Sequence, residues 1–345
     1  DNHIGGSFKI EADESYIITQ QYINNTAIVR TNFKNPKNEF EVLDFMTRYK
    51  LDDQNFYSPP EIQRLIKPIK GLPKIKVLYN PTLEYANGKT KTYEKEDFIV
   101  SVFDEASYET LFLYTDIEKK KILENKEFEL SKSVYLNLSY NEKIDLPSLS
   151  KSEEEFKKTQ EYWLNWCKKS PSFKLYNKEI TRSSITLKLL TFEKTGAVLA
   201  AATTSIPETI GEVRNWDYRF CWIRDASMVI KIIAKLGHQR IVKNFIDFIV
   251  NLIPNKNEKL QIMYGIDGQK TLTEKILKHL SGYKNSKPVR IGNAAYIQKQ
   301  NDIYGILVDA IHFQIEKFKD ISYKHEQLWS IVKSVVWVVE KNCKK

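Results

Sequence analysis

The chain has 345 residues, of which 42% are apolar and 12% aromatic. It is therefore long enough for two domains with sizeable cores, and this composition argues against disorder of the whole chain. The net charge of +9 comes from 53 basic and 44 acidic side chains. The lysines are interleaved with glutamates, and no basic run is longer than the three lysines at 119–121. This pattern is typical of a solvated surface rather than of a nucleic-acid interface.

The three cysteines, Cys167, Cys221 and Cys343, lie far apart and form no CxxC pair. We therefore expect no disulfide framework, no structural zinc site and a reducing compartment, the cytoplasm. No apolar run approaches the ~20 residues of a membrane span, so no membrane partner is expected. The chain opens without a methionine, directly onto strand-like residues, and we expect its true start to lie upstream, where a signal could also lie.

Short segments rich in β-branched and aromatic residues follow one another up to about residue 145. They are separated by turn signals such as NPKN and ANGKT. This spacing predicts an antiparallel β-sandwich over residues 1–146. The predicted strands include SFKIEA, SYIITQQYI, TAIVRTNF, FEVLDFM, PKIKVLYN, DFIVSVF, ETLFLYT and SVYLNLSY.

The composition changes over residues 147–176, which we interpret as a helical linker between two domains. Pro147 and a cluster of serines precede a glutamate-rich first helical turn. The aromatic residues that this predicted helix carries are Phe156, Tyr162, Trp163 and Trp166.

The pattern of residues 177–345 is helical. ITRSSITLKLLTFEKTG predicts a helix that ends at Gly196, and DASMVIKIIAKLG predicts a helix with Asp225 as its N-cap and Gly237 as its stop. Further helices are predicted at HQRIVKNFIDFIVNLI, near NAAYIQKQNDIYGILVDAIHFQIEKF and at HEQLWSIVKSVVWVVEKN. The long loop at 255–292 is more often functional than incidental. Helix pairs separated by long loops predict an α/α toroid or solenoid, although no fixed-period repeat is visible.

The stretch NWDYRFCWIRDA at 215–226 contains four aromatic and four charged residues in twelve positions. Arg224 and Asp225 lie at a loop-to-helix junction, where a planar fork of donors beside a carboxylate can bind adjacent hydroxyls of a sugar. The aromatic rings offer a flat surface to the apolar face of a pyranose. From the residues alone, an internal ion-pair network with buried aromatic side chains is an equally good account.

The same stretch resembles the signature of glycoside hydrolase family 15, the glucoamylase and acid-trehalase-like family. GAVLAAATTSIPETIGEVR before it, and LQIMYGIDG and GYKNSKPVRIGNAAYIQKQNDIYG after it, resemble the microbial branch of that family in the same order. The weaker N-terminal segments GGSFKI, VLDFM and PEIQRLIKPIKGL are similar to its β-sandwich domain. The resemblance therefore covers essentially the whole chain.

The resemblance implies an N-terminal antiparallel β-sandwich, a helical linker and the first part of an (α/α)6 barrel. It implies inverting hydrolysis of terminal α-linked glucose in an oligosaccharide or disaccharide, with no cofactor and no metal. The residues that match substrate-binding positions are Tyr218, Trp222, Arg224 and Asp225. The residues that match positions lining or supporting the same pocket are Trp216, Asp217, Arg219, Tyr264, Gly265, Arg290 and Asn293.

The resemblance also implies two catalytic glutamates, an acid that follows a tryptophan and a more distant base, in the later half of the barrel. No Trp-Glu pair occurs in the barrel portion of this chain, so we expect both glutamates beyond Lys345 and no catalytic residue within it. Asp302 and Asp309, seven apart on a predicted helix, are interpreted as a solvated stripe. Glu208 and Glu212 flank the motif and are interpreted as tuning charge or orienting an arginine.

Two hypotheses of different class follow. In the first, the chain is the glucose-recognition half of an α-glucoside hydrolase, inactive alone and poorly soluble because an open half-toroid exposes apolar helix faces. In the second, a truncated, non-catalytic protein binds a carbohydrate or pairs with another chain that completes the ring. Nucleic-acid binding driven by the charge of +9 is a disfavoured third, and it predicts steep salt dependence. α-1,4 and α-1,6 glucosides and trehalose present the same terminal glucose, so the sequence leaves the linkage open.

Overall fold

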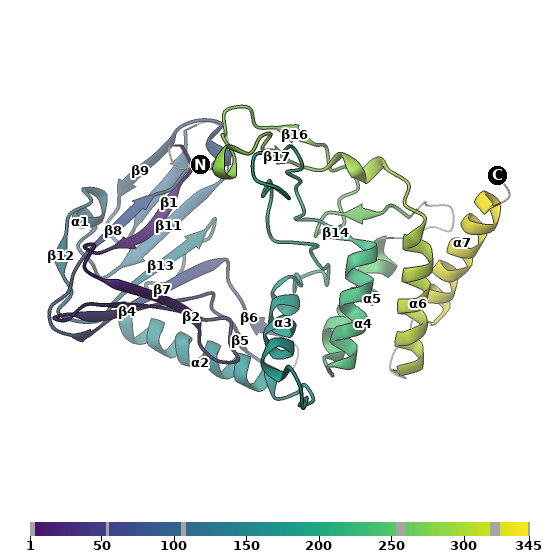
Figure 1. Cartoon of the computed structure of the whole chain (residues 1–345), viewed down its shortest axis with the longest axis horizontal. Coiled ribbons are helices and arrows are strands. Elements are labelled where there is room, and N and C mark those ends of the chain that lie inside the picture. The colour runs from purple at the N-terminus through teal and green to yellow at the C-terminus, as the bar shows by residue number, and fades with distance from the viewer. Residues whose placement is uncertain (1–3, 53–54, 105–107, 253–259, 318–324, 344–345) are drawn as a thin grey trace. The chain divides into compact units, whose positions relative to one another are not determined.

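The chain forms two compact units, one up to Lys168 and one from Lys169 onward. The structure, a computed structural model, describes all residues except 1–3, 53–54, 105–107, 253–259, 318–324 and 344–345 (Figure 1). Strands dominate the first unit, and helices joined by long loops dominate the second. This order of β before α confirms the fold class predicted from the sequence.

The first unit is built from antiparallel strands, and the predicted strand segments are found as strands. A short helix, α1 (Lys119–Leu123), and a 3-10 turn, η1 (Glu84–Ala86), lie between them. The strands are β1 Ser7–Glu11, β2 Ile17–Tyr22, β3 Val29–Lys34, β4 Glu39–Phe45, β5 Tyr49–Lys50, β6 Phe56–Tyr57, β7 Glu61–Lys70, β8 Lys74–Asn80, β9 Thr90–Glu94, β10 Ile99–Phe103, β11 Thr110–Thr115, β12 Phe128–Glu129 and β13 Val134–Tyr140.

Two sheets enclose the main core of this unit. An eight-stranded sheet has the order β2-β3-β4-β7-β13-β11-β10-β9, and a three-stranded sheet has the order β1-β8-β12. Phe40 and Leu136 of the large sheet share one cluster of buried residues with Ile75 and Val77 of β8. Because inward-facing side chains alternate with outward-facing ones along each strand, the two sheets bury one face each against the other.

The strand β7 runs through the middle of the large sheet, between β4 and β13, although it contains Pro68. Proline has no N–H and is tolerated in a sheet only at an edge or a bulge. The pairing of β7 with β13 ends at Ile66, and the pairing with β4 shifts register opposite Pro68. A bulge therefore accommodates the proline, and the sequence pattern did not predict this strand.

The helix α2 (Leu149–Cys167) packs on the other face of the large sheet. Ser148 caps it by accepting a hydrogen bond from the N–H of Lys151. Phe156 packs against the cluster that holds Leu65, and Thr159 accepts a hydrogen bond from the N–H of Arg48 at 3.1 Å. The helix found within the predicted linker is thus part of the first unit.

Five helices organise the described part of the second unit. α4 (Ile223–Lys235) packs on α3 (Asn177–Leu189), α5 (Gln239–Leu252) and α6 (Asp302–Lys317), and α7 (His325–Cys343) packs on α5 and α6 (Figure 1). The buried residues of α5 recur at helical spacing and give it a strongly apolar face, which packs against its neighbours. No helix in the described ranges is long and apolar enough to cross a membrane.

Two predicted helix ends in the second unit were wrong. α3 ends at Leu189 rather than at Gly196, because the chain turns back through a bridge between Thr191 and Val198. α4 has Trp222 as its N-cap, so Asp225 lies inside the first turn instead of capping the helix. A carboxylate in that turn still interacts favourably with the positive end of the helix dipole.

The long loops between the helices contain short strands and turns that hold them in place. β14 pairs with β15 and places Cys221 opposite Tyr264, while β16 pairs with β17. These elements are β14 Cys221–Trp222, β15 Met263–Tyr264, β16 Lys275–Ile276, β17 Arg290–Ile291, and the 3-10 turns η2 Tyr283–Asn285 and η3 Ala294–Ile297.

Candidate functional site

A pocket of about 490 Å³ lies in the second unit where the 215–226 motif enters α4. Its volume falls within the ~300–1,000 Å³ typical of sites for small molecules. Its walls come from the motif, from the 274–300 loop and from a short segment before the motif. The lining residues are Ala200, Trp216, Tyr218, Trp222, Arg224, Asp225, Glu274, Arg290, Asn293, Ala294, Ala295, Gln298 and Gln300.

The two rings predicted to bind substrate lie together on one wall of this pocket. The centroids of Tyr218 and Trp222 are 5.9 Å apart, and their planes are tilted by 51°. Trp222 is 6% exposed and packs with Ile262 and Met263, so its position is fixed by the core. Burial raises the pKa of Tyr218, and Glu208 at 3.5 Å from its hydroxyl adds to the effect. The phenol therefore stays neutral and can both donate and accept a hydrogen bond.

The predicted charged pair, Arg224 and Asp225, also lines the pocket. Nε of Arg224 lies 3.5 Å from Oδ2 of Asp225, and Nη1 donates to Oε1 of Gln300 at 3.0 Å and to Oδ2 of Asp302 at 2.9 Å. Among the described residues, Nη2 of Arg224 has no hydrogen-bond partner. Oδ2 of Asp225 is buried and has no hydrogen-bond partner in the described part of the chain, while the Asp225 side chain as a whole is 43% exposed. The pair thus keeps a donor edge and an acceptor available beside the pocket.

Asp217 and Arg219 do not line the pocket but brace it. The carboxylate of Asp217 is fully buried and accepts from Nε and Nη2 of Arg219 at 2.9 Å and 2.8 Å. It also accepts from the N–H of Gly292 at 3.0 Å, and its main-chain oxygen accepts from the side chain of Asn293. Asp217 therefore joins the motif to a loop about 75 residues later in the chain. This bonding satisfies a carboxylate that would be costly to bury alone.

Arg290 joins three parts of the pocket wall. Its guanidinium carbon lies 4.4 Å from the ring centroid of Trp216, and its Nε donates to Oε1 of Glu274 at 3.1 Å. Nη1 donates to the main-chain oxygens of Val213 and Asn215 at 3.0 Å and 3.2 Å. An arginine that is stacked on an indole and held by a carboxylate has few other rotamers available. The guanidinium of Arg290 and the indole ring of Trp216 are therefore held in place before a ligand binds.

Tyr264 and Gly265 are placed outside the pocket lining. Tyr264 is 1% exposed, its backbone pairs with Cys221, and its hydroxyl accepts from the N–H of Gln261 at 2.9 Å. The N–H of Gly265 donates to the main-chain oxygen of Gln269. Both residues therefore hold the β14–β15 pair from which α4 starts.

Sequence reasoning missed several residues that line the pocket, among them Glu274, Gln298 and Gln300. No motif marked Glu274, although Gln300 lies in the IQKQNDIYG segment that carried the family resemblance. Asp302 and Asp309, interpreted as a solvated stripe, are about half exposed, and each contacts a cation of α4. Their ion-pair partners are Arg224 and Lys231 respectively.

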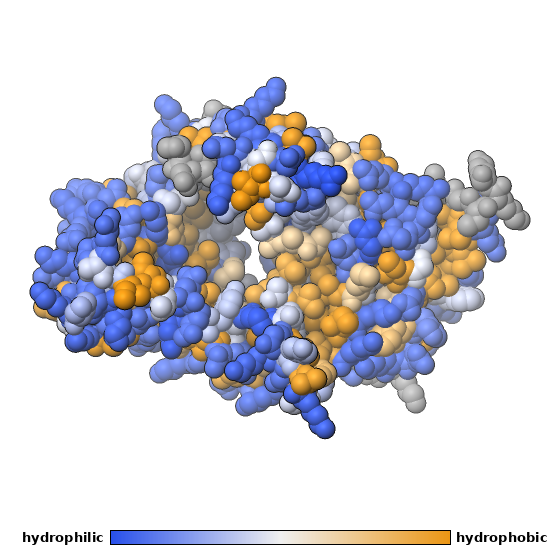
Figure 2. Space-filling view, viewed as in Figure 1, coloured by the Kyte–Doolittle hydropathy of each residue, from blue (hydrophilic) through white to orange (hydrophobic). Residues whose placement is uncertain are grey.

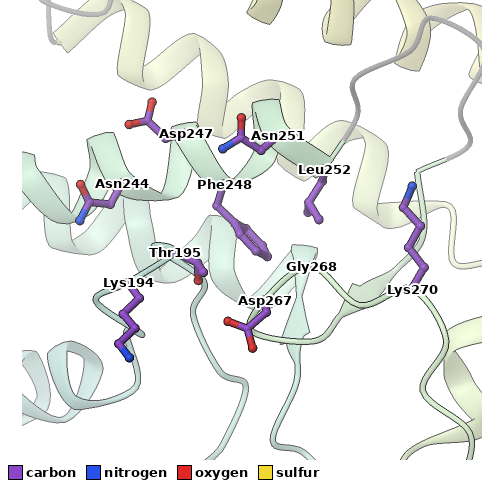
Figure 3. A pocket seen from close by; sticks show the side chains of 10 residues that line it. All are labelled: Lys194, Thr195, Asn244, Asp247, Phe248, Asn251, Leu252, Asp267, Gly268 and Lys270. Atoms are coloured by element: carbon purple, nitrogen blue, oxygen red, sulfur yellow. The ribbon is translucent and has the colours of Figure 1, made fainter. Parts of the chain in front are cut away.

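A second pocket, of about 460 Å³, shares none of its lining residues with the first. Asn244, Asp247 and Asn251 line it from α5, and Asp267 and Lys270 line it from the facing loop (Figure 3). No group of three or more His, Cys, Asp and Glu side chains in the described part of the chain could hold a metal ion.

Comparison with known proteins places these features in a family. The trehalase of Thermoplasma acidophilum is 31% identical over 98% of this chain and 60% of its own length. The trehalase of Mycolicibacterium smegmatis is 36% identical over 67% of this chain and 35% of its own length. Trehalase 2 of Sulfolobus acidocaldarius is 29% identical over 98% of this chain and 58% of its own length. The chain thus spans about 60% or less of the length of each of these curated relatives.

The helical unit matches a family profile. Residues 174–345 match the sequence profile described as "Glycosyl hydrolases family 15", and this range contains every residue of the 490 Å³ pocket. From the profile and the relatives together, the chain belongs to glycosyl hydrolases family 15.

Proposed function

We propose that this chain carries the glucose-recognition part of an inverting α-glucoside hydrolase. The observation that carries the proposal is the arrangement of Arg224 and Asp225 in the pocket, where Nη2 is a donor without a partner among the described residues and the partly exposed carboxylate of Asp225 supplies an acceptor. Each hydroxyl of a sugar can both donate and accept, so one of two adjacent hydroxyls can accept from the guanidinium while the other donates to the carboxylate. A guanidinium beside a carboxylate therefore binds them as a pair.

The aromatic residues of the pocket support a pyranose as the ligand. Tyr218 and Trp222 form one aromatic wall, and Trp216 under Arg290 forms another. A pyranose has apolar C–H faces and a polar rim, so flat rings with hydrogen-bonding groups between them match both parts. Because the relatives named above are trehalases, trehalose is the first substrate to test, followed by α-1,4- and α-1,6-linked glucosides.

Inversion requires a protonated carboxyl group for the leaving oxygen and an ionised one for water, ~6.5–9.5 Å apart. The carboxyl groups that line the pocket are those of Asp225, next to Arg224, and Glu274, paired with Arg290. Each of these carboxyl groups is engaged with an arginine, an arrangement that suits substrate binding rather than proton transfer to a leaving oxygen. We propose that both catalytic glutamates lie outside these 345 residues.

The test combines titration calorimetry of the chain with glucose, maltose and trehalose and a glucose-release assay on the same sample. We expect binding without release. Release of glucose would show that carboxylates within this chain catalyse the reaction. Absence of binding to all three sugars would contradict the proposed recognition site.

Two substitutions test the site itself. Asp225→Asn keeps the shape but removes the ionised acceptor, and Arg224→Lys keeps the charge but removes the planar fork. We expect each to weaken glucose binding about tenfold or more, because hydrogen bonds to charged groups are worth ~1.5–3 kcal/mol. Asp267→Asn, in the second pocket, serves as the control and should bind like the unchanged chain. Affinities within a factor of two for all three variants would refute the assignment.

A further inference from the structure

The guanidinium of Arg224 is held on one side by two acceptors that sequence reasoning did not assign to the site. Oε1 of Gln300 and Oδ2 of Asp302 accept from the same nitrogen, Nη1, at 3.0 Å and 2.9 Å. Because Nη1 carries two hydrogens, the two contacts use both of them. Nε, with its single hydrogen, faces Asp225. The orientation of the guanidinium is thereby fixed, and the Nη2 edge is the one left for a ligand.

We propose that Asp302, assisted by Gln300, is a positioning residue that aims the Nη2 edge of Arg224 at the sugar. The inference rests on the proposed function, since it concerns how the same site binds glucose. Asp302 itself is not among the residues that line the pocket, so it acts through Arg224. Without it, Nη1 keeps one acceptor, and the long arginine side chain regains rotamers that point away from the pocket.

The small contribution that the Arg224–Asp302 ion pair can make to stability distinguishes a positioning role from a stabilising one. The side chains of Arg224 and Asp302 are 35% and 44% exposed, and exposed ion pairs contribute at most about 1 kcal/mol to stability. Removing Asp302 should therefore leave the fold intact. A large effect on binding would then come from the orientation of Arg224.

The chain offers a matched control two helical turns further along α6. Asp309 contacts Lys231, so a second acidic residue of α6 contacts a second cation of α4. Neither Lys231 nor Asp309 lines the pocket. If Asp302 served only to tie α6 to α4, replacement of Asp309 would have the same consequence as replacement of Asp302.

The experiment measures glucose and trehalose affinity by calorimetry for Asp302→Ala, Asp302→Asn and Asp309→Ala in the full 345-residue chain. We expect a loss of about tenfold for Asp302→Ala and less than twofold for Asp309→Ala. Asp302→Asn should fall between them, because an amide oxygen can still accept from Nη1 without the charge. Melting temperatures and far-UV circular dichroism of all three variants check that the fold is kept. Asparagine is also favoured at helix starts, so the Asp302→Asn variant retains the start of α6.

A double variant makes the test specific to orientation. Lysine has no planar guanidinium to orient. In an Arg224→Lys background, Asp302→Ala should therefore weaken sugar binding by less than a further twofold. Losses of affinity that multiply fully in the double variant, or equal losses for Asp302→Ala and Asp309→Ala, would overturn this inference but not the proposed function. If the unchanged chain binds neither glucose nor trehalose, the proposed function fails and the inference fails with it.

Discussion

His238, directly after the end of α4, is a buried ionisable residue of the second unit outside the pocket. It is 5% exposed, and Nε2 lies 2.9 Å from Oγ of Ser170. Burial lowers the pKa of His238 to about 4, and the nearby Lys169 and Lys188 add to the effect. The imidazole therefore remains neutral over most of the physiological range and joins the first residues of the second unit to the α4–α5 turn.

The lowered pKa of His238 predicts how the stability of the second unit depends on pH. The unfolded chain protonates this residue near pH 6.5, whereas the folded chain does so only near pH 4. Between these values the unfolded state binds more protons, so stability falls with falling pH, by roughly 3 kcal/mol in total. His238→Gln removes this titration. Chemical unfolding at pH 7 and pH 4.5 should show a smaller loss for the variant than for the unchanged chain, and an equal loss would refute the prediction.

At the scale of elements, two glycines with nearly equal backbone angles differ in what surrounds them. Gly196 has φ +85°, and an added Cβ would lie 2.3 Å from the main-chain carbon and oxygen of Asn244 in α5. Gly211 has φ +88°, and an added Cβ would meet nothing within 4 Å. The turn after Thr191 thus approaches α5 closely only because residue 196 has no side chain.

Alanine at these two positions separates backbone strain from close approach. Gly211→Ala should cost about 1 kcal/mol, the usual penalty of a left-handed residue. Gly196→Ala should cost more than twice as much, because α5 must also move away. Unfolding free energies from denaturant titration provide the measurement. Similar losses at both positions would mean that the turn adapts to the methyl group without cost.

The sequence predicted elements well where local pattern and packing agree. FEVLDFM and SVYLNLSY alternate or cluster apolar residues and became strands of the large sheet. β7 was missed because Pro68 and its lysines break the pattern, and only the bulge formed with β4 explains its place. The N-cap of α4 was misassigned because β14 carries the chain directly into the helix at Trp222.

The site was predictable only in part, for a similar reason. The aromatic and charged motif drew attention to Arg224 and Asp225, and the family resemblance added Arg290 and Asn293 from a distant loop. Glu274 has no local signature, because its place in the pocket depends on the fold of the 274–300 loop. Tyr264 is aromatic and close to the motif in pairing, yet its side chain is buried away from the lining.

At the scale of the whole molecule, the helices of the second unit expose several large apolar side chains to solvent. On α7, Leu328 and Ile331 are buried, whereas Trp329 and Trp337 are 60% and 58% exposed. On α4, Met228 is 56% exposed. Figure 2 shows hydrophobic residues gathered over these helices. Large apolar side chains exposed in this way promote self-association in water.

Replacement of the two exposed tryptophans should therefore raise solubility. We expect Trp329→Lys with Trp337→Lys to increase the soluble fraction at a given concentration while the melting temperature changes by only a few degrees. Glu326→Lys, on the same helix, raises the net charge by the same two units as the double variant without removing apolar area, and serves as the control. Equal gains for the double variant and the control would assign the effect to charge rather than to apolar surface.

The bond between Asp217 and Gly292 also constrains the order in which this protein can mature on the ribosome. The two residues are 75 positions apart, so at ~5–20 residues per second the motif emerges roughly 4–15 s before its partner. During that interval the carboxylate of Asp217 has Arg219 beside it but not the N–H of Gly292, and the aromatic residues of the motif lack the loop that later covers them. A nascent chain stalled in this window would present Trp216 and Trp222 to chaperones, whereas one released past residue 292 would not.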